Sequence, residues 1–241
     1  MVYLGCAGWS LSRAYASAFP AEGSHLQRYA GSLCAVEINS SFYRPHRPST
    51  YARWAASVPE HFRFSVKLPR EITHERRLVD CAAALADFFE QCGELGQRLG
   101  CVLVQLPPSL AFEPQLAERF LAALRRLYPG PVAIEPRHVS WLAAEPLLVA
   151  MQVAQVAADP PRFGADSQPR GWPGLAYWRL HGTPRMYFSD YPSDWLKALA
   201  PRLEASAIAQ VDTWCIFDNT AGDAAVGDAL ALQALLNAAR S

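Results

Sequence analysis

The sequence lacks the features that mark a membrane protein, a nucleic-acid-binding protein or a disulfide-stabilised protein. Lys and Arg together number 22, Asp and Glu together number 22, and the formal net charge is therefore zero. No overall field attracts nucleic acid or anionic lipid, so such a partner would need a local basic patch. The longest apolar runs fall far short of the roughly 20 residues of a membrane-spanning helix. We expect no membrane partner, and the charge balance does not favour nucleic acid.

The six cysteines include no C-x-x-C pair, and Cys6, Cys101 and Cys215 lie in apolar runs typical of buried strands. A chain of 241 residues with 51% hydrophobic composition has enough apolar side chains for a large core without disulfides. The first ten residues, MVYLGCAGWS, contain neither the basic stretch nor the long apolar stretch of a secretory signal. We therefore expect reduced thiols and a cytoplasmic protein.

Sequence signatures of several common enzyme classes are absent as well. No G-x-G-x-x-G follows the first apolar run, and the chain has no P-loop, no G-x-S-x-G and no H-E-x-x-H. No local motif indicates a dinucleotide, a nucleotide triphosphate or a catalytic zinc ion, and we expect no cofactor. The chemistry must come from residues that the fold brings together.

Short apolar runs alternate with longer amphipathic segments along the chain. The runs cover 2–8, 35–40, 62–69, 101–108, 132–137, 153–160, 175–182 and 213–220, and helical patterns cover 25–32, 49–57, 80–97, 114–127, 141–150, 193–209 and 224–239. Strands alternating with helices form parallel sheets, and eight units predict an α/β fold, a single (β/α)8 TIM-type barrel over residues 1–241. An open doubly wound sheet is the alternative. Residues 160–174 hold four prolines and three glycines, so the sixth helix is expected to be short or missing.

Polar residues appear toward the carboxyl ends of these runs, although strands covered on both faces should be nearly all apolar. They are Glu37 and Asn39, Ser65 and Lys67, Gln105, Glu135 and Arg137, and Arg179 and His181. Residues two apart share one face of a strand. These side chains are therefore predicted to point into the barrel near its carboxyl end, where the active sites of this fold are built.

Seven ordered blocks of the chain resemble the YecE-like family, a domain of unknown function (DUF72). They are GCAGWS, EINSSFYRPH, FSVKLPREITHERRL, LVQLPPSLAFE, IEPRHVSW, YWRLHGTPRMYFSDYP and FDNTAGDAAVGDAL. The resemblance implies a TIM-type barrel and an intracellular bacterial or archaeal protein, and it implies no established reaction. The chain departs from the family pattern at Pro136, where the family has an aromatic residue. It also has Asp218 and Asn219 where the family has an Asn–Asn pair, so Asp218 adds a carboxylate.

The basic residues at these strand ends and in the following loops predict a site for an anion. Guanidinium groups bind phosphate and carboxylate oxygens in pairs, and aromatic rings stack on a base or a sugar. The candidate ligand contacts are Lys67, Arg70, Arg137, Arg179, Arg185, His138 and His181, with Tyr43, Trp141, Tyr187 and Tyr191 between them and Asn39, Gln105 and Asn219 as further polar contacts. Three of the cations accompany only two carboxylates on the predicted inner face, which leaves one positive charge unbalanced.

Other interpretations of the same residues remain open. Glu37 and Glu135 can pair with the basic residues in a purely structural network. A divalent metal ion is the runner-up ligand, held by Glu135, Asp159, His181 and Asp218 at the ends of four successive strands. Lys67 is a candidate for Schiff-base formation. A nucleic-acid-binding protein without catalytic activity would use the rim arginines on phosphates and the tyrosines on unstacked bases.

The functional expectation is an intracellular enzyme that acts on a small anionic or phosphate-bearing ligand bound at the carboxyl-terminal mouth of the barrel. Hydrolase or lyase chemistry is its concrete form, with Glu135 or Glu37 as general base and His181 as the acid or as a hydrogen-bond donor. A metal-dependent nuclease-like or sugar-isomerase-like enzyme is the alternative. Since the rim is expected to be wet, Glu135→Gln is expected to change ligand binding more than stability.

Overall fold

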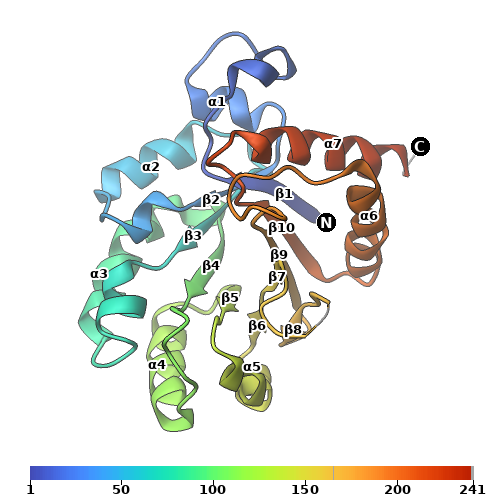
Figure 1. Ribbon diagram of the computed structural model, residues 1–241. Coiled ribbons are helices and arrows are strands. Elements are labelled where there is room, and N and C mark those ends of the chain that lie inside the picture. Colours follow the sequence, from blue (N-terminus) through green and yellow to red (C-terminus); the bar gives the residue numbers. More distant parts are fainter. Residues whose placement is uncertain (165, 240–241) are drawn as a thin grey trace.

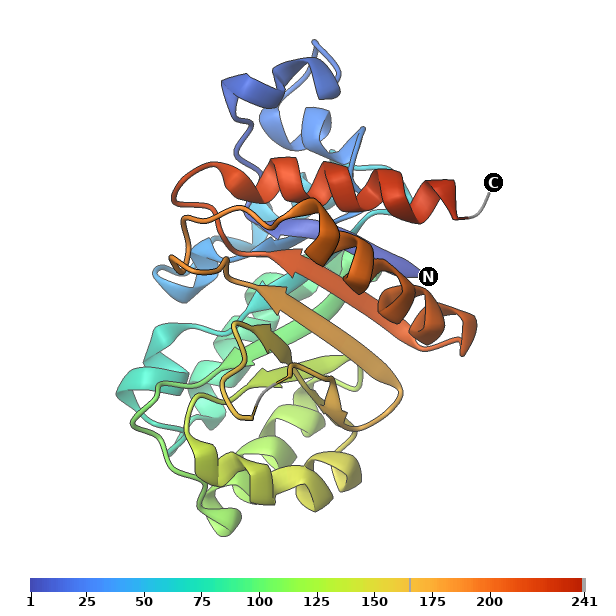
Figure 2. The ribbon, with the colours of Figure 1, turned by 45° about the vertical axis from the view of Figure 1, so that its right-hand side comes forward.

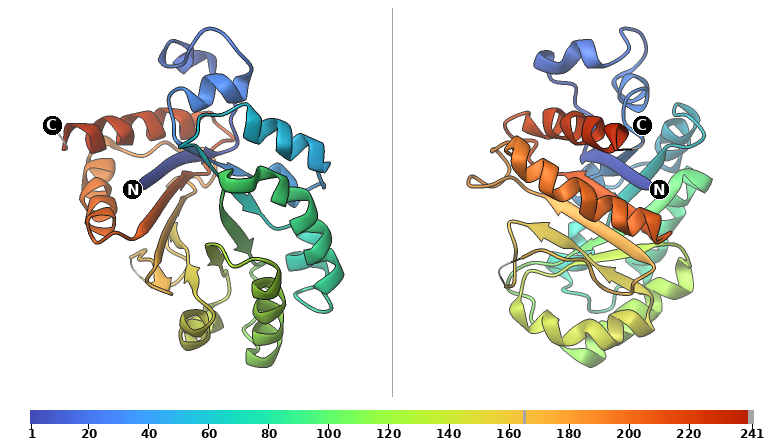
Figure 3. Two further views of the ribbon diagram at one scale, coloured as in Figure 1. Left: turned by 180° about the vertical axis from the view of Figure 1, so that it is seen from behind. Right: turned by 90° about the vertical axis from the view of Figure 1, so that its right-hand side faces the viewer.

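In the computed structural model, which describes residues 1–164 and 166–239, helices form a ring around an inner wall of strands (Figure 1). The same ring is seen from behind and from the side in Figure 3, where α6 (Ser193–Ile208) lies next to α7 (Ala224–Ala238). The protein is an α/β protein whose sheet has the shape of a nearly closed, TIM-like barrel. The predicted fold class is therefore confirmed.

Nine of the ten described strands run parallel to their neighbours in one sheet. Its order is β7-β9-β10-β1-β2-β3-β4-β5-β6-β8. The parallel strands are β1 (Val2–Ala7), β2 (Ala35–Ile38), β3 (Arg63–Lys67), β4 (Leu99–Gln105), β5 (Val132–Glu135), β6 (Val153–Gln155), β7 (Ala157–Asp159), β9 (Leu175–Leu180) and β10 (Asp212–Phe217).

The sixth predicted strand changes its partner halfway along its length. Its first half, β6, pairs with β5, and its second half, β7, pairs with β9. Only Val156 separates the halves, and its backbone N–H donates to the Ile134 carbonyl oxygen at 2.8 Å. Residues 153–159 thus connect the two ends of the sheet and bring the barrel close to closure.

The described residues between β7 and β9 contain no helix, as the proline and glycine content of this segment predicts. They contain instead the two-residue strand β8 (Arg170–Gly171), which pairs antiparallel with β6. No pattern in residues 160–174 predicts this strand. Because β8 continues the sheet beyond β6, it covers part of the edge that β6 leaves free where the sixth strand turns to its second partner.

The remaining helices follow the predicted segments closely. They are α1 (His25–Ala30), α2 (Pro48–Ala56), α3 (Ala82–Cys92), α4 (Pro114–Leu127) and α5 (Glu145–Ala150). Short turns join them to the strands. They are the 3-10 turns η1 (Arg13–Ala18), η2 (Ser40–Phe42), η4 (Gly93–Arg98) and η5 (Val139–Ala144) and the π-helical turn η3 (Glu71–Glu75). Figure 2 shows η1, in dark blue, standing away from the ring, and none of its residues is buried. Among the described helices, none is both long enough and apolar enough to cross a membrane.

Helix α4 illustrates why these segments fold as they do. The Glu113 side chain accepts a hydrogen bond from the Leu116 backbone N–H, and Pro114 occupies the first helical position, where its missing N–H costs nothing. Phe120, Leu121 and their neighbours at helical spacing are buried against the strands. Two arginines near the end of the helix complement its dipole.

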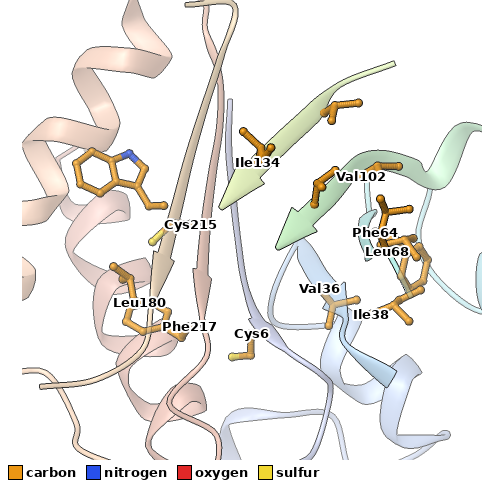
Figure 4. Close-up of a cluster of buried hydrophobic side chains, with 14 of the residues drawn as sticks. Cys6, Val36, Ile38, Phe64, Leu68, Val102, Ile134, Leu180, Cys215 and Phe217 are labelled. Carbon is orange, nitrogen blue, oxygen red and sulfur yellow. The ribbon is translucent and has the colours of Figure 1, made fainter. Parts of the chain in front are cut away.

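Alternate residues of each strand separate the two faces of the barrel wall. Outward side chains such as Val36, Phe64 and Phe217 belong to the large core between strands and helices (Figure 4). Inward side chains form a second buried cluster, in which small residues such as Ala133 and Ala154 accompany large ones such as Tyr177 and Trp214. The small inner residues leave space inside the barrel for long polar side chains that enter from its carboxyl end.

The first two strands approach each other so closely that only glycine fits at position 5. The Tyr29 hydroxyl accepts from the Cys6 N–H at 2.8 Å and donates to the Ala35 carbonyl oxygen at 3.0 Å, so it joins β1 to β2. A Cβ atom at Gly5 would lie 1.9 Å from that carbonyl oxygen. A methyl group therefore cannot be added without separating the strands.

We expect Gly5→Ala to lower the free energy of unfolding by about 3 kcal/mol or more, because backbone atoms must move to admit the methyl group. Gly93→Ala is the control, since a Cβ atom at Gly93 would meet no atom within 4 Å and the backbone there is helical. It should change the stability by less than about 1 kcal/mol. Urea unfolding of both variants measures the difference, and equal stabilities would contradict the packing described for β1 and β2.

Candidate functional site

A cluster of charged side chains lies inside the carboxyl end of the barrel. The mouth cluster, as we name it, consists of Glu37, Lys67, Glu135, Arg137, Arg179, His181 and Asp218. Each residue ends a strand or follows one, on the face that the strand turns inward. The strand alternation thus brings together six of the nine polar residues that the sequence predicted to point into the barrel, and Asp218 joins them.

Arg179 is the centre of the mouth cluster and is fully buried. Its Nε and Nη2 donate to the two carboxylate oxygens of Glu37 at 2.9 and 2.8 Å. Its Nη1 donates to Glu135 Oε2 at 3.0 Å, and Nη2 also lies 3.0 Å from Asp218 Oδ2. Three carboxylates on three strands therefore surround one guanidinium group, which leaves Arg179 little capacity for a ligand.

Glu135 is 1% exposed and bridges Arg179 to the outer part of the mouth. Its Oε1 accepts from Nε and Nη2 of Arg137 at 3.1 and 3.0 Å. Burial alone would raise the pKa of Glu135, but the charges of Arg179, His181 and Arg137 together outweigh it and hold the pKa well below its usual value. Glu135 is therefore a carboxylate that stays ionised, in a buried environment and not at the wet rim that the sequence analysis expected.

His181 lies between two carboxylates and is fully buried. Its Nδ1 lies 3.0 Å from Asp218 Oδ2, within hydrogen-bond distance. Its Nε2 lies 3.3 Å from Glu135 Oε1 but is too poorly aligned for a hydrogen bond, and it has no other partner among the described residues. A carboxylate on Nδ1 fixes the orientation of an imidazole ring, which leaves Nε2 as the atom that can exchange a proton.

Lys67 enters the mouth from β3 and is 4% exposed. Its Nζ donates to Asn39 Oδ1 at 3.1 Å and lies 4.0 Å from the centre of the Phe42 ring. Burial, and then the charge of Arg179, lower the pKa of Lys67 to about 8, although Glu37 and the other carboxylates oppose the shift. No carboxylate in the described part of the chain forms an ion pair with this ammonium group.

Arg162 is a member of the site that the sequence analysis missed. It belongs to the proline-rich segment after β7, and its charge acts on Arg137 and Glu135 at the mouth. Its Nε is buried without a hydrogen-bond partner among the described residues, and its Nη2 contacts only the Met186 sulfur, at 3.5 Å. Burial, and then the charge of Arg137, lower its pKa. No pattern in residues 160–174 distinguishes Arg162, because the segment has no strand or helix period around it.

Tyr187 covers the same part of the mouth from the loop after β9. Its hydroxyl accepts from Arg137 Nη2 at 3.4 Å, and its ring meets the His181 ring edge to face at 5.6 Å between centres. The backbone of Tyr187 has a φ of +70°, which is unfavourable for a bulky side chain. Such strain is common at functional sites, where the surrounding structure holds a side chain in a required position.

The mouth carries one more positive charge than negative. Lys67, Arg137, Arg162 and Arg179 are the four cations, and Glu37, Glu135 and Asp218 are the three carboxylates. The sequence-based count also had a surplus of one, but it omitted Asp218 and Arg162, whose charges cancel. Cations of the mouth also act on His74 nearby. Burial, and then the charges of Lys67, Arg70 and Arg137, lower the pKa of His74 to about 4.

Glu37 is held by structural contacts on every side. Besides both bonds from Arg179, its Oε2 accepts from the Tyr177 hydroxyl at 3.1 Å. The same hydroxyl lies 2.9 Å from the Ser65 hydroxyl oxygen, one layer deeper in the barrel. Glu37 is fully buried and both of its oxygens are occupied. Its contacts therefore suit a support for Arg179 and not a general base.

Several other predicted ligand contacts lie outside the mouth. The Trp141 indole N–H donates to the Leu110 carbonyl oxygen in the outer core, and the Tyr191 hydroxyl donates to Asp159 Oδ1 at 2.9 Å. The Asn219 amide donates to Asp228 Oδ2 at 2.7 Å and so ties a loop to α7. Each of these side chains is nearly or fully buried and serves the surrounding packing.

Three further candidates have different positions. His138 caps the turn η5, where its Nδ1 accepts from the Ser140 N–H at 3.2 Å. Tyr43 is 72% exposed and lines a groove outside the mouth. Gln105 ends β4 beside Glu135, on the inward face, and is 7% exposed. Only Gln105 of these three has the position expected of a contact inside the mouth.

The runner-up metal ligands do not form a metal site in the described part of the chain, where no group of three or more acidic, histidine or cysteine side chains is arranged to hold an ion. Glu135, His181 and Asp218 do lie together, but the Arg179 guanidinium group stands between the carboxylates. Asp159 instead accepts hydrogen bonds from Tyr191 and Thr183.

We expect Glu135→Gln to lower the free energy of unfolding by about 3–5 kcal/mol, because Arg137 loses its carboxylate partner and Arg179 loses one of three. Glu71→Gln is the matched control, since Glu71 forms an exposed ion pair with Arg76 at 2.7 Å. This substitution should lower the free energy of unfolding by less than about 1 kcal/mol. Urea unfolding measures the free energy of unfolding of both variants. A similar small loss in both would show that Glu135 is dispensable for the fold.

Two curated relatives resemble part of the chain. The UPF0759 protein YecE of Escherichia coli (strain K12) is 29% identical over 145 residues, which are 59% of this chain and 51% of that protein. The UPF0759 protein YunF of Bacillus subtilis (strain 168) is 26% identical over 149 residues, which are 59% and 53% of the two chains. The chain spans about half the length of the curated relatives it matches.

Solved structures of similar fold cover nearly the whole chain. A DUF72 family protein from Enterococcus faecalis V583 has a TM-score of 0.81 at 23% identity, with 98% of this chain and 96% of that chain covered. A DUF72 family protein from Thermotoga maritima MSB8 has a TM-score of 0.77 at 25% identity, with 98% and 99% covered. Their fold supports the barrel described above.

The family resemblance that the seven sequence blocks indicated is confirmed by the family model. The model described as "Protein of unknown function DUF72" matches residues 3–241. Apart from Val2, the match includes every residue of the described strands, and it includes every residue of the mouth cluster. This chain therefore belongs to the DUF72 family of proteins of unknown function.

Proposed function

We propose that this protein is an enzyme that binds a small anionic substrate, such as a phosphate ester or a carboxylate, at the mouth of the barrel. The observation that carries the proposal is the unpartnered Nε of Arg162, buried beside Arg137 in a mouth with one surplus positive charge. A buried guanidinium N–H without an acceptor is costly, and an anionic oxygen would satisfy it.

The binding groups of this site are Arg162, Arg137 and Lys67. Arg137 is the most exposed arginine of the mouth cluster, with 13% of its side chain accessible, and two of its nitrogens face Glu135. Lys67 has a neutral amide as its hydrogen-bond acceptor. These three cations, unlike Arg179, retain N–H groups for a ligand. Arg179 is assigned to the support of the barrel top, since three carboxylates occupy it.

His181 is the proposed proton-transfer residue. Asp218 on Nδ1 orients the ring, and the ring atom Nε2 makes no aligned hydrogen bond in the described chain. An imidazole so oriented can donate a proton to a leaving oxygen or accept one from a nucleophile. Glu135 is proposed to orient Arg137 and to stabilise the protonated ring of His181, because its ionised carboxylate bonds to Arg137 and lies 3.3 Å from His181 Nε2.

Nucleic-acid binding gains less support from the geometry. That interpretation needs several exposed aromatic rings near the rim cations. Tyr187 is half-buried beside Arg137, but Trp141 and Tyr191 are buried in the packing of the barrel. Tyr43 is exposed, but it lies beside paired charges outside the mouth. A steep loss of affinity for single-stranded DNA with increasing salt would be required to restore this alternative.

Arg162→Met should weaken the binding of sulfate, a stable divalent anion, by about tenfold or more, because it removes a charge-assisted hydrogen bond. Arg126→Met is the matched control, since Arg126 is exposed near the end of α4, at the opposite end of the barrel. Isothermal titration with sulfate measures both variants and the unaltered protein. Equal affinities in all three, or no sulfate binding by the unaltered protein, would refute the proposal.

Sulfate affinity should also fall as the pH rises through about 8, the pKa of Lys67. Lys67 is charged below this pH and neutral above it, so its ammonium group attracts an anion only below this pH. We expect a loss of about tenfold between about pH 7 and pH 9, with sulfate itself unchanged in charge. His74, with a pKa of about 4, is neutral throughout this range.

Lys67→Met provides the control for the pH dependence. The variant should bind sulfate more weakly at about pH 7, and its affinity should be nearly independent of pH up to about pH 9. Glu135, Asp218 and Arg179 keep their charges across this range, because their mutual attraction holds the pKa of each carboxyl below, and that of the guanidinium above, its usual value. A pH dependence that survives Lys67→Met would assign the titration to another group and remove Lys67 from the anion site.

A further inference from the structure

A cleft beside the mouth has a lining of different chemistry. This β1–β2 cleft, about 320 Å³ in volume, lies where β1 and β2 end, and its lining includes Gly8, Trp9, Ser10, His25, Asn39 and Ser40. A second hollow of about 190 Å³ shares Gly8 and Ser10 with it and extends to Thr220 after β10. The cleft is within the range of ordinary small-molecule sites.

Asn39 connects this cleft to the anion site. Its side-chain oxygen accepts from Lys67 Nζ at 3.1 Å, and the same residue lines the β1–β2 cleft. The amide N–H groups of Asn39 donate to no residue in the described part of the chain. A molecule whose anionic group is held at Lys67 therefore has Asn39 as its next neighbour, and its remaining atoms extend toward β1.

The lining favours an uncharged group that is rich in hydroxyls. None of the described residues that line the β1–β2 cleft is Asp, Glu, Lys or Arg. Hydroxyls of Ser10 and Ser40 and the Asn39 amide offer both donors and acceptors. Trp9 adds an apolar ring, held edge to face against Trp54 at 5.0 Å between centres. Indole rings pack against the C–H faces of sugar rings, while hydroxyls and amides bind sugar hydroxyls.

Gly8 keeps the cleft open. Its φ is +106°, a conformation that other residues rarely adopt, and a Cβ atom there would meet no atom within 4 Å. Its N–H donates to the Glu37 carbonyl oxygen at 2.9 Å, so the loop is fixed to β2 directly beneath the mouth. Because Gly8 lines both hollows, a larger residue at this position would occupy part of their space.

The groove on the other side of Lys67 is less suitable for such a group. It has a volume of about 390 Å³ and runs between the loop after β2 and η3. Its walls carry the ion pairs Arg70–Glu75 and Arg76–Glu71, whose charges are already matched. A sugar ring there would have to compete with these pairs for their hydrogen bonds.

We propose that the β1–β2 cleft binds the hydroxyl-rich, uncharged part of the substrate, and that the substrate is a sugar phosphate or a related polyhydroxylated phosphate ester. This inference rests on the proposed anion site at Lys67, Arg137 and Arg162. It assigns the anionic group to the cations of the mouth and the sugar ring to Trp9, Ser10 and Asn39.

The test compares inorganic phosphate with glycerol 3-phosphate, ribose 5-phosphate and glucose 6-phosphate by isothermal titration at neutral pH. At least one ester should bind about tenfold more tightly than inorganic phosphate, a gain that comes from the sugar contacts. Ser10→Trp, at an exposed position of the cleft, should reduce the ratio of the two affinities to about one. Trp9→Leu should reduce it as well.

Ala205→Trp is the control for adding an indole ring, because Ala205 is exposed near the end of α6, far from the mouth. It should leave the affinity ratio unchanged. Phosphate binding without preference for any ester would overturn the sugar assignment and leave the anion site intact. A preference that persists in both Ser10→Trp and Trp9→Leu would also overturn it. Binding of neither phosphate nor any ester would refute the anion site itself.

Discussion

The buried guanidinium group of Arg179 determines much of the arrangement inside this barrel. A fully buried charge is tolerated only where hydrogen bonds and opposite charges surround it, and Arg179 has carboxylates from β2, β5 and the end of β10 around it. Those three elements lie on different sides of the barrel, so a single side chain links them across its interior. Small inner residues such as Ala133 and Ala154 give this side chain its space.

The same requirement divides the side chains of the mouth into an inner layer with paired charges and an outer layer with incomplete pairing. Glu37 and Asp218 have their oxygens directed at Arg179, and Tyr177 completes the environment of Glu37 from below. Residues farther out, such as Lys67 and Arg162, are incompletely paired. In the described chain, the hydrogen-bond donors of the mouth that lack partners therefore lie in an outer layer, above a layer whose charges are paired.

The sequence predicted the fold in detail because strand and helix periods are local. It placed α4 at its observed bounds, and the alternation in β3 and β9 correctly separated inward from outward side chains. The site was predictable only where it lies on strands, since alternation orients Glu135 and Arg179. It was not predictable in the loops: Arg162 has no periodic neighbours, and the burial of Trp141 and Tyr191 depends on packing between distant segments.

The change of partner at Val156 leaves ladders of unequal length around the mouth of the barrel. β6 and β7 have three residues each, whereas β9 and β10 have six each and pair along their full length. Short ladders open more readily than long ones. Arg162 leaves from the end of β7, while Arg179 is anchored on β9. In the proposed anion site, Arg162 therefore follows the shorter of these ladders, so that opening of β7 would displace Arg162 while β9 and β10 stay paired.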